Sequence, residues 1–419
     1  MNKFAHMADV HLGAHIEPVL QKLELQTFDL AMARCVELGV DFVLICGDLF
    51  HVAIPDLGVV NSALRSMMQV QRQGIPIYAI YGSHDYTPNG TSVIDVLSTA
   101  GVLTNVFKPE FEGEHLKLGI TVDQKTGAKL AGISARKIGL ESRYYDALDR
   151  DSLEKEEGFK VFAFHTGLTE LKPQHLSEME TVSVEMLPRG FGYYAGGHIH
   201  ERGEYDAEGF ENIVFPGPLF TGYGRDLEAT ARGEKRGMYV VEFDDRVRDK
   251  KFVPIVSVGG VFREYDLTGK NSKEAGEVMT RDLGGVDVSG RLVVIRAFGE
   301  LAGGRVGEVG FAGIRSELAG RGAIHVYLSR NSLRSKDAPQ SEAAGQDPAM
   351  IEQALLSKEV GRVSVSQANL TGEQGAKTAL ELLRLLRQQA KLGESKKDYV
   401  ARMTSAGRKT LGVGDVNQN

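Results

Sequence analysis

Histidine and aspartate residues form five short clusters within the first 200 residues of the chain. Each cluster falls where an apolar run stops and a glycine or polar turn begins, so we expect each to lie at a strand end, where α/β sheets place their functional groups. In chain order the clusters are Asp9-Val10-His11, Gly47-Asp48 with His51, Gly82-Ser83-His84-Asp85, His165, and Gly197-His198-Ile199-His200. If these strand ends meet at one edge of a sheet, the clusters form a single polar site.

The residue types and spacing in these clusters indicate metal binding. In Asp9-x-His11 and His198-x-His200, the two-residue period of a strand directs both side chains to one face. Mixed imidazole and carboxylate ligands suit Mn, Fe or Zn better than Ca or Mg, which prefer oxygen alone. Asp48 has two carboxylate oxygens and lies between the other clusters in sequence, so we interpret it as a bridging ligand. Two ions about 3.5–4 Å apart clamp the oxygens of a phosphoryl displacement, which predicts phosphoester hydrolysis by a metal-activated water.

At these clusters the sequence resembles the calcineurin-like metallophosphoesterases and, more narrowly, the SbcD-like nucleases of DNA double-strand-break repair. The narrower resemblance rests on residues 8–13, residues 47–51 and the Pro-Gly turn at 215–218. One position departs from the family pattern, because Ser83 stands where the family has asparagine. The resemblance covers the first half in detail and the rest in layout. It implies an α/β fold with a four-layer sandwich of two mixed sheets flanked by helices, a smaller α+β capping domain and a C-terminal helical segment.

The resemblance also implies a role for each residue of the site. One metal ion would be held by Asp9, His11, Asp48 and His200. The other ion would be surrounded by Asp48, Ser83, His165 and His198. His84 would protonate or stabilise the leaving oxygen, Asp85 would orient the ring of His84, and His51 would assist. The expected cofactor is two Mn ions per subunit, with Mg, Fe or Zn as alternatives.

Length and composition set further limits. A chain of 419 residues is too long for one core and predicts two or three domains. Its net charge of −7 argues against DNA binding by bulk attraction, although metals and local basic residues can still hold phosphates. No apolar stretch approaches the ~20 residues of a membrane span, and the first residues are typical of a strand rather than a signal peptide. We expect a cytoplasmic, nucleoid-associated protein in which Cys35 and Cys46 are buried free thiols.

Hydrophobic periodicity places the clusters on alternating strands and helices. Strands are predicted over 3–9, 41–46, 75–81, 129–134, 160–164 and 191–196. Amphipathic spacing predicts helices over 20–38 and 57–73 between the first three strands. This order is typical of βαβ units and a parallel sheet. The apolar stripes of the two helices would pack in the core, and in the resembled family helices at this place also build a homodimer; both interpretations stay open.

The rest of the chain divides by composition into three parts. The predicted domains are 1–235 for the nuclease, 236–330 for a capping domain, 331–349 for a linker and 350–419 for a helical segment. Strands at 238–243, 252–258, 261–267, 292–298 and 323–328 are predicted for the second domain. It carries no His/Asp cluster, so a purely structural domain is the alternative. The linker is rich in Ser, Ala, Asp, Gln and Pro and lacks periodicity.

The C-terminal segment is helical and basic. Residues 371–410 hold nine Lys or Arg against four Asp or Glu. Two short helices cannot bury much apolar surface alone, so they need a partner surface. In the resembled family such a segment docks onto the coiled-coil base of an SMC-like ABC ATPase of the SbcC type, which here would bind residues 350–419. The chain has no G-x-x-x-x-G-K-[ST] motif, so any ATPase must be another chain. Direct DNA binding by this segment is the alternative.

These observations predict a metal-dependent DNA exonuclease and endonuclease of double-strand-break repair that acts with an SMC-like ATPase. A phosphatase or small-molecule phosphodiesterase on the same fold is one alternative. A weakly catalytic scaffold for the ATPase is another, and the serine at position 83 makes it conceivable.

Overall fold

The protein is described from a computed structural model. The described residues are 1–87, 91–136, 142–173, 176, 178–337, 356, 360, 372–388 and 396–412. The chain divides into two compact units, Met1–Asp337 and Ala338–Asn419. Among the described residues, no helix is long and apolar enough to cross a membrane.

The first sheet carries three of the five clusters. Its strand order is β16-β15-β1-β2-β3-β4. The strands are β1 (Asn2–Met7), β2 (Phe42–Cys46), β3 (Ile77–Ile80), β4 (Thr104–Asn105), β15 (Gly237–Phe243) and β16 (Val247–Pro254). Strands β1 to β4 run parallel, whereas β15 pairs antiparallel with β1 and with β16. The first three strand-end clusters therefore lie at one edge of this sheet.

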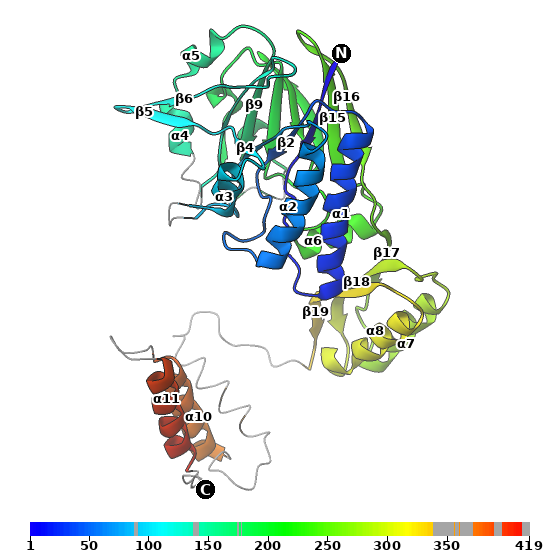
Figure 1. Ribbon diagram of the computed structural model, residues 1–419. Helices are drawn as coiled ribbons and strands as arrows, with labels where there is room; N and C mark the ends of the chain where they lie inside the picture. The colour runs from blue at the N-terminus through cyan, green and yellow to red at the C-terminus, as the bar shows by residue number, and fades with distance from the viewer. Residues whose placement is uncertain are drawn as a thin grey trace. The chain divides into compact units, whose positions relative to one another are not determined.

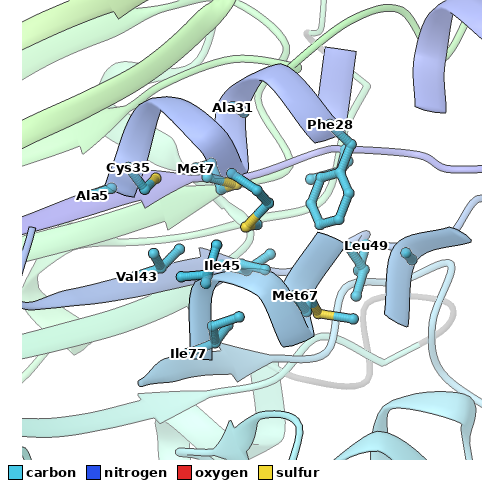
Figure 2. Packing of buried hydrophobic residues seen from close by; sticks show 14 of the residues in the cluster. Ala5, Met7, Phe28, Ala31, Cys35, Val43, Ile45, Leu49, Met67 and Ile77 are labelled. Carbon is cyan, nitrogen blue, oxygen red and sulfur yellow. The ribbon is translucent and has the colours of Figure 1, made fainter. Parts of the chain in front are cut away.

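Three helices cover the outer face of this sheet (Figure 1): α1 (Pro18–Glu37), α2 (Leu57–Gln71) and α3 (Val93–Thr99). A proline opens α1, and the carboxylate of Asp56 caps α2 by accepting from Gly58 N–H. Apolar residues of α1 and α2, among them Phe28 and Met67, pack on Val43 and Ile45 of β2 (Figure 2). The predicted inward stripe of these helices is therefore core.

The second sheet carries the other two clusters. Its strand order is β13-β14-β12-β9-β8-β7. The strands are β7 (Thr121–Val122), β8 (Lys129–Ile133), β9 (Lys160–His165), β12 (Tyr193–Gly197), β13 (Gly203–Ala207) and β14 (Phe210–Phe215). The four central strands are parallel. Its outer face packs against α4 (Ser142–Ala147) and α5 (Arg150–Glu154), together with loop segments that carry short pieces of regular structure. Those pieces are β5 (Pro109–Glu112), β6 (His115–Leu118), β10 (Gly167–Leu168), β11 (Thr181–Val182), η2 (Thr169–Leu171) and η4 (Val184–Met186).

The inner faces of the two sheets pack against each other. Phe4 and Phe42 of the first sheet stack with ring centroids 4.9 Å apart, and Tyr193 of the second sheet meets Phe4 edge-on. Helices outside each sheet complete four layers, so the predicted sandwich of two mixed sheets is confirmed. Cys35 and Cys46 are buried and free, as the sequence predicted.

A small subdomain, residues 259–335, follows the first sheet. Its parallel strands β17 (Gly259–Asp266), β18 (Arg291–Leu301) and β19 (His325–Ser335) alternate with α7 (Ser272–Gly284) and α8 (Phe311–Gly320), and η5 (Val306–Val309) precedes α8. One face of its sheet packs on these helices. The other face packs on the start of α1 and on α6 (Gly224–Ala231).

The structure differs from the predicted boundaries at two places. Strands β15 and β16 belong to the first sheet, so this sheet continues past residue 236 to Pro254, and the strand expected over 252–258 ends there. Alternating apolar residues indicate that a segment is a strand but do not indicate which sheet it joins. Strand β15 belongs to the first sheet because it pairs with β1. The linker expected from residue 331 starts later, because β19 runs to Ser335.

The second unit contains two described helices, α10 (Gly372–Leu386) and α11 (Lys396–Leu411). They contact each other, and Tyr399 Oη donates to Gln388 O at 2.9 Å. The expected C-terminal helical segment is therefore confirmed, while most of the linker and residues 389–395 lie outside the described residues. Leu386 and Val400 remain exposed on this helix pair.

Candidate metal centre

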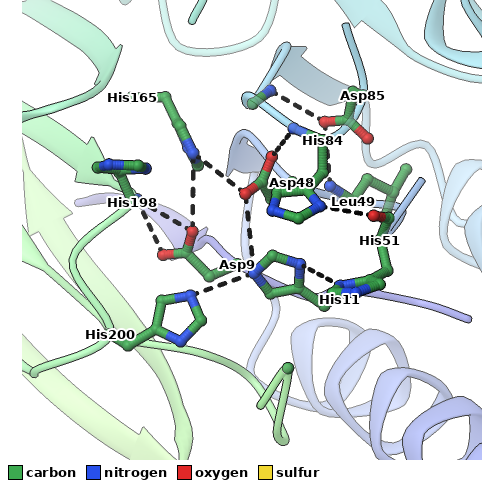
Figure 3. Close-up of polar contacts among 12 residues, drawn as sticks. Asp9, His11, Asp48, Leu49, His51, His84, Asp85, His165, His198 and His200 are labelled. Carbon is green, nitrogen blue, oxygen red and sulfur yellow. Dashed lines mark hydrogen bonds and ion pairs between the residues drawn. The ribbon is translucent and has the colours of Figure 1, made fainter. Parts of the chain in front are cut away.

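The predicted clusters meet at the carboxyl ends of the parallel strands of both sheets (Figure 3). From the first sheet, Asp9 and His11 follow β1, Asp48 follows β2, and His84 follows β3. From the second sheet, His165 ends β9, while His198 and His200 follow β12. Residues almost 200 positions apart in the sequence thus share one site.

Close backbone approach makes this convergence possible. A Cβ on Gly82 would lie 1.9 Å from Asp48 Oδ1, and a Cβ on Gly47 would lie 2.2 Å from His165 Nδ1. Only glycine fits at these two positions. Four candidate ligands also have positive φ angles, a conformation that non-glycine residues rarely adopt and that clusters at functional sites: Asp9 (51°), His11 (51°), Asp48 (51°) and His198 (83°).

One group of candidate ligands consists of Asp9, His11 and His200. Their ligand atoms lie within 4.8 Å of one another. Nε2 of His11 is 3.1 Å from Nε2 of His200. Both oxygens of Asp9 accept from the backbone N–H of His198, at 3.0 and 3.1 Å, which fixes the carboxylate in place.

A second group consists of Asp9, Asp48 and His165, again with ligand atoms within 4.8 Å. Nδ1 of His165 donates to Cys46 O at 2.8 Å, so its Nε2 faces Asp48 Oδ2 at 3.3 Å and Asp9 Oδ1 at 3.9 Å. The ring of His198 lies beside that of His165, with centroids 5.2 Å apart. Ser83 and His198 line the same cavity as Asp48.

These residues fit divalent metal ions. Nε2 of His165 is fully buried and has no hydrogen-bond partner of good geometry among the described residues. Nε2 of His11 and Nε2 of His200 lie 3.1 Å apart, so a cation between them would take the lone pairs of both rings in their Nδ1-protonated tautomers. Imidazoles mixed with two buried carboxylates suit a transition-metal ion.

Burial and mutual charge set the ionisation of this centre. Burial lowers the pKa of His165, but the negative charges of Asp48 and Asp9 outweigh burial and raise it to about 10. Those same contacts hold the pKa of Asp48 well below its usual range against the opposing effect of burial. Burial raises the pKa of Asp9 to about 6 and lowers that of His198 to about 4. Without metal, His165 is therefore the residue that carries the positive charge facing Asp48.

In the third cluster, the hydrogen bonds of Asp85 and His84 differ from those predicted. Asp85 is buried, and its carboxylate accepts from the backbone N–H groups of Gly82, Leu49 and Phe50 rather than from the ring of His84. Instead, Nδ1 of His84 donates to the carbonyl oxygen of His51 at 2.6 Å. The prediction that Asp85 orients this ring is therefore wrong, because the carboxylate is already used in holding the loops. The His51 residue that accepts this bond also stacks its ring on that of His84, with centroids 4.8 Å apart.

Comparison with known families agrees with this geometry. Residues 2–202 match the model of the calcineurin-like phosphoesterase family. Residues 2–202, which contain all five clusters, are therefore similar to this family. The family implies divalent metal ions, although their identity is not given by the match.

Curated relatives match this chain over a similar length. A protein of Archaeoglobus fulgidus, described as DNA double-strand break repair protein Mre11, is 27% identical over 223 residues, which are 52% of this chain and 50% of that protein. Proteins with this description from Aeropyrum pernix and Saccharolobus solfataricus are 30% and 26% identical, over 48% and 61% of this chain and 49% and 63% of their own lengths. The chain thus spans about half to just under two thirds of these relatives.

Two residues beyond the matched region also reach the site. Oδ2 of Asp226 lies 3.0 Å from Nδ1 of His200, and Oη of Tyr223 lies 2.8 Å from Nε2 of His84. Both come from the start of α6, a helix that was not predicted from the sequence. The sequence signal for the start of this helix was Asp226, an acidic residue in its first turn. Its carboxylate accepts from Tyr223 N–H, as in a capping box.

A cavity of about 600 Å³ opens beside the metal centre, within the size range of ligand sites. His84, Tyr223 and Arg225 line it on the polar side. Leu176 and Met179 contribute apolar wall. A substrate in this cavity would therefore meet both the candidate metal ligands and His84.

Ser83 is where the candidate site departs from the pattern of the resembled family. A serine hydroxyl is shorter than an asparagine amide and a weaker ligand when protonated, so in a two-ion site the ion beside Ser83 should bind more weakly than the other. We expect Ser83→Asn to tighten this second site, and wild-type activity to rise steeply with Mn²⁺ concentration. Calorimetric titration of the metal-free wild type and variant with Mn²⁺ checks this. Equal affinities at two sites in the wild type would contradict it, and no second site in either protein would favour a scaffold.

Proposed function

We propose that this chain is a Mn²⁺-dependent DNA nuclease of double-strand-break repair that hydrolyses phosphodiester bonds. The observation that carries the proposal is the meeting of two His/Asp groups with His84 at one cavity. The relatives named as Mre11 support DNA as the substrate and break repair as the setting. The metallophosphoesterase match supports an ester hydrolase.

The proposed ligands of the two ions are Asp9, His11, Asp48, Ser83, His165, His198 and His200. When bound, divalent ions would activate water and neutralise the charge that develops on the phosphate. Nδ1 of His165 is tied to Cys46 O, so its Nε2 is presented to the ions in a fixed orientation. Asp48 is fixed in turn, because its Oδ1 accepts from His84 N–H at 2.8 Å.

His84 is proposed to act on the leaving oxygen. Its ring is held at both nitrogens, by the His51 carbonyl and the Tyr223 hydroxyl, and it lines the cavity beside Ser83. Because a carbonyl oxygen can only accept, Nδ1 carries a proton and Nε2 is the nitrogen that faces the cavity. When Nε2 also carries a proton, the imidazolium held in this way can donate that proton to the oxygen that leaves phosphorus and return to the neutral ring.

End-labelled single- and double-stranded DNA, incubated with Mn²⁺ or Mg²⁺, tests the proposal directly. We expect degradation with Mn²⁺ and none after chelation. Phosphate release from p-nitrophenyl phosphate without DNA degradation would instead identify a phosphatase. Failure of both reactions in a protein that binds metal would identify a scaffold.

The helix pair α10–α11 is proposed to bind an SMC-like ABC ATPase of the SbcC type. Leu386 is 70% exposed and Val400 is 52% exposed, so these side chains do not contribute to a core of the helix pair. Their exposed apolar surface is available to a partner. Removing residues 371–419 should leave the nuclease active on short DNA but unable to join the ATPase. Size-exclusion chromatography of the truncated chain with the ATPase measures this, and Leu386→Asp in the full chain gives a milder version. Persistent co-elution of both variants would rule out this docking site.

A homodimer is proposed through α1 and α2, the helices near 20–38 and 57–73. Apolar side chains stand exposed at the start of α2, with Ile54 81% and Leu57 82% exposed, and Met68 partly exposed further along the helix. We expect Leu57→Asp to shift the chain from dimer to monomer in analytical ultracentrifugation. Val96→Asp, at an exposed apolar residue of α3, is the matched control and should remain dimeric. A wild-type monomer at all concentrations would refute the dimer.

The small subdomain is proposed to act as the capping domain. It packs on α6, which borders the cavity through Tyr223, Arg225 and Ala229. A purely structural subdomain would pack on α6 in the same way. A capping role is therefore measured by the effect of the subdomain on DNA cleavage.

A further inference from the structure

Asp226 contacts a candidate metal ligand from outside the matched domain. The residue is 4% exposed, and its Oδ2 accepts from Nδ1 of His200 at 3.0 Å. A carboxylate accepts this bond, so the proton of the neutral imidazole sits on Nδ1. Nε2, which lies 3.1 Å from Nε2 of His11, is left with its lone pair toward the metal centre.

The same oxygen also fixes the loop before α6. Oδ2 of Asp226 accepts from Gly222 N–H at 2.9 Å and from Tyr223 N–H at 3.0 Å. Gly222 in turn passes close to the site, since a Cβ there would lie 2.8 Å from the ring of His11. One carboxylate therefore holds the His200 ring and the backbone that borders His11.

Packing against the small subdomain fixes α6 itself. Leu227 and Ala231 of α6 lie in one apolar cluster with Leu292 and Val294 of β18. Arg236, also buried, donates to the backbone oxygen of Asp226 at 3.3 Å. The position of Asp226 is thus set by parts of the chain that follow residue 202.

We propose that Asp226 is a positioning residue that holds His200 in the orientation and tautomer needed to bind a divalent ion. The inference rests on the metal site of the proposed function. Carboxylates that orient metal-binding histidines typically change metal affinity 10- to 100-fold when removed. Asp226 would have this effect without touching the ion.

Calorimetric titration of the metal-free full chain with Mn²⁺ alone tests the proposal. We expect Asp226→Asn, which keeps an acceptor but removes the charge, to weaken one Mn²⁺ site about tenfold, and Asp226→Ala to weaken it about a hundredfold. Glu228→Gln is the matched control, because Glu228 lies on the same helix but faces Arg296 at 3.9 Å. It should leave both affinities unchanged.

A mutant cycle separates positioning from general damage to the fold. If Asp226 acts through His200, Asp226→Asn should change the Mn²⁺ affinity less than twofold in a His200→Ala background. An equal loss in both backgrounds, or no loss in either, would overturn the inference. Absence of Mn²⁺ binding by the wild type would instead overturn the metal site itself. DNA is not part of the titration, so a failed nuclease assay leaves the result standing.

Discussion

His84→Ala should lower the rate of phosphodiester cleavage by about a hundred- to ten-thousandfold, the usual contribution of a positioned general acid. Metal content should stay almost unchanged, because His84 is proposed to act on the leaving oxygen rather than on the ions. Its ring is held by the His51 carbonyl and the Tyr223 hydroxyl, both outside the proposed ligand set. Single-turnover cleavage of labelled DNA and elemental analysis of the purified variant measure the two effects.

The alternative role for His84 is that of a metal ligand. Ring nitrogens of His11, His51 and His84 lie within 4.8 Å of one another and could hold an ion themselves. Loss of an ion in His84→Ala would therefore make this residue a ligand and contradict its proposed role. His115→Ala is the control, because His115 is exposed on β6 and should change neither rate nor metal content.

The affinity for Mn²⁺ should rise by at least about tenfold per pH unit between pH 6 and 8. In the metal-free protein the pKa of His165 is raised to about 10, so the ring is protonated throughout this range. An imidazole binds metal only when Nε2 is free, so each binding event releases this proton. One released proton gives a tenfold change per pH unit, or about a hundredfold over two units.

Below pH 6 the dependence should steepen. The pKa of Asp9 is raised to about 6, so at lower pH the carboxylate also takes a proton that must leave before a metal binds. Calorimetry in buffers of different ionisation enthalpy counts the released protons, and competition with a calibrated chelator gives the affinity. In His165→Gln the slope between pH 6 and 8 should fall by about one released proton, along with most of the affinity. A wild-type affinity that is constant from pH 6 to 8 would show that His165 is already neutral.

Features that depend on local sequence pattern could be predicted without the structure. Functional residues at strand ends could be predicted from Asp9-x-His11 and from the glycine before Asp48. Strand period and turn type depend on a few neighbouring residues, so a short stretch of sequence is enough to indicate them. The alternating strands and helices indicated parallel sheets in the same way, and the strands ended where the clusters began.

The distant groups that complete the site became apparent only from the folded chain. Asp85 was predicted to orient His84 because the two residues are adjacent in sequence. Its carboxylate instead accepts from the backbone N–H groups of Leu49 and Phe50. The ring of His84 donates to the His51 carbonyl. Asp226 orients His200 from a helix outside the recurring motifs. Its position depends on packing between α6 and β18, more than 60 residues further along the chain. Hydrogen bonds of this kind are selected by which surfaces fit together on folding, and no short stretch of sequence contains that information.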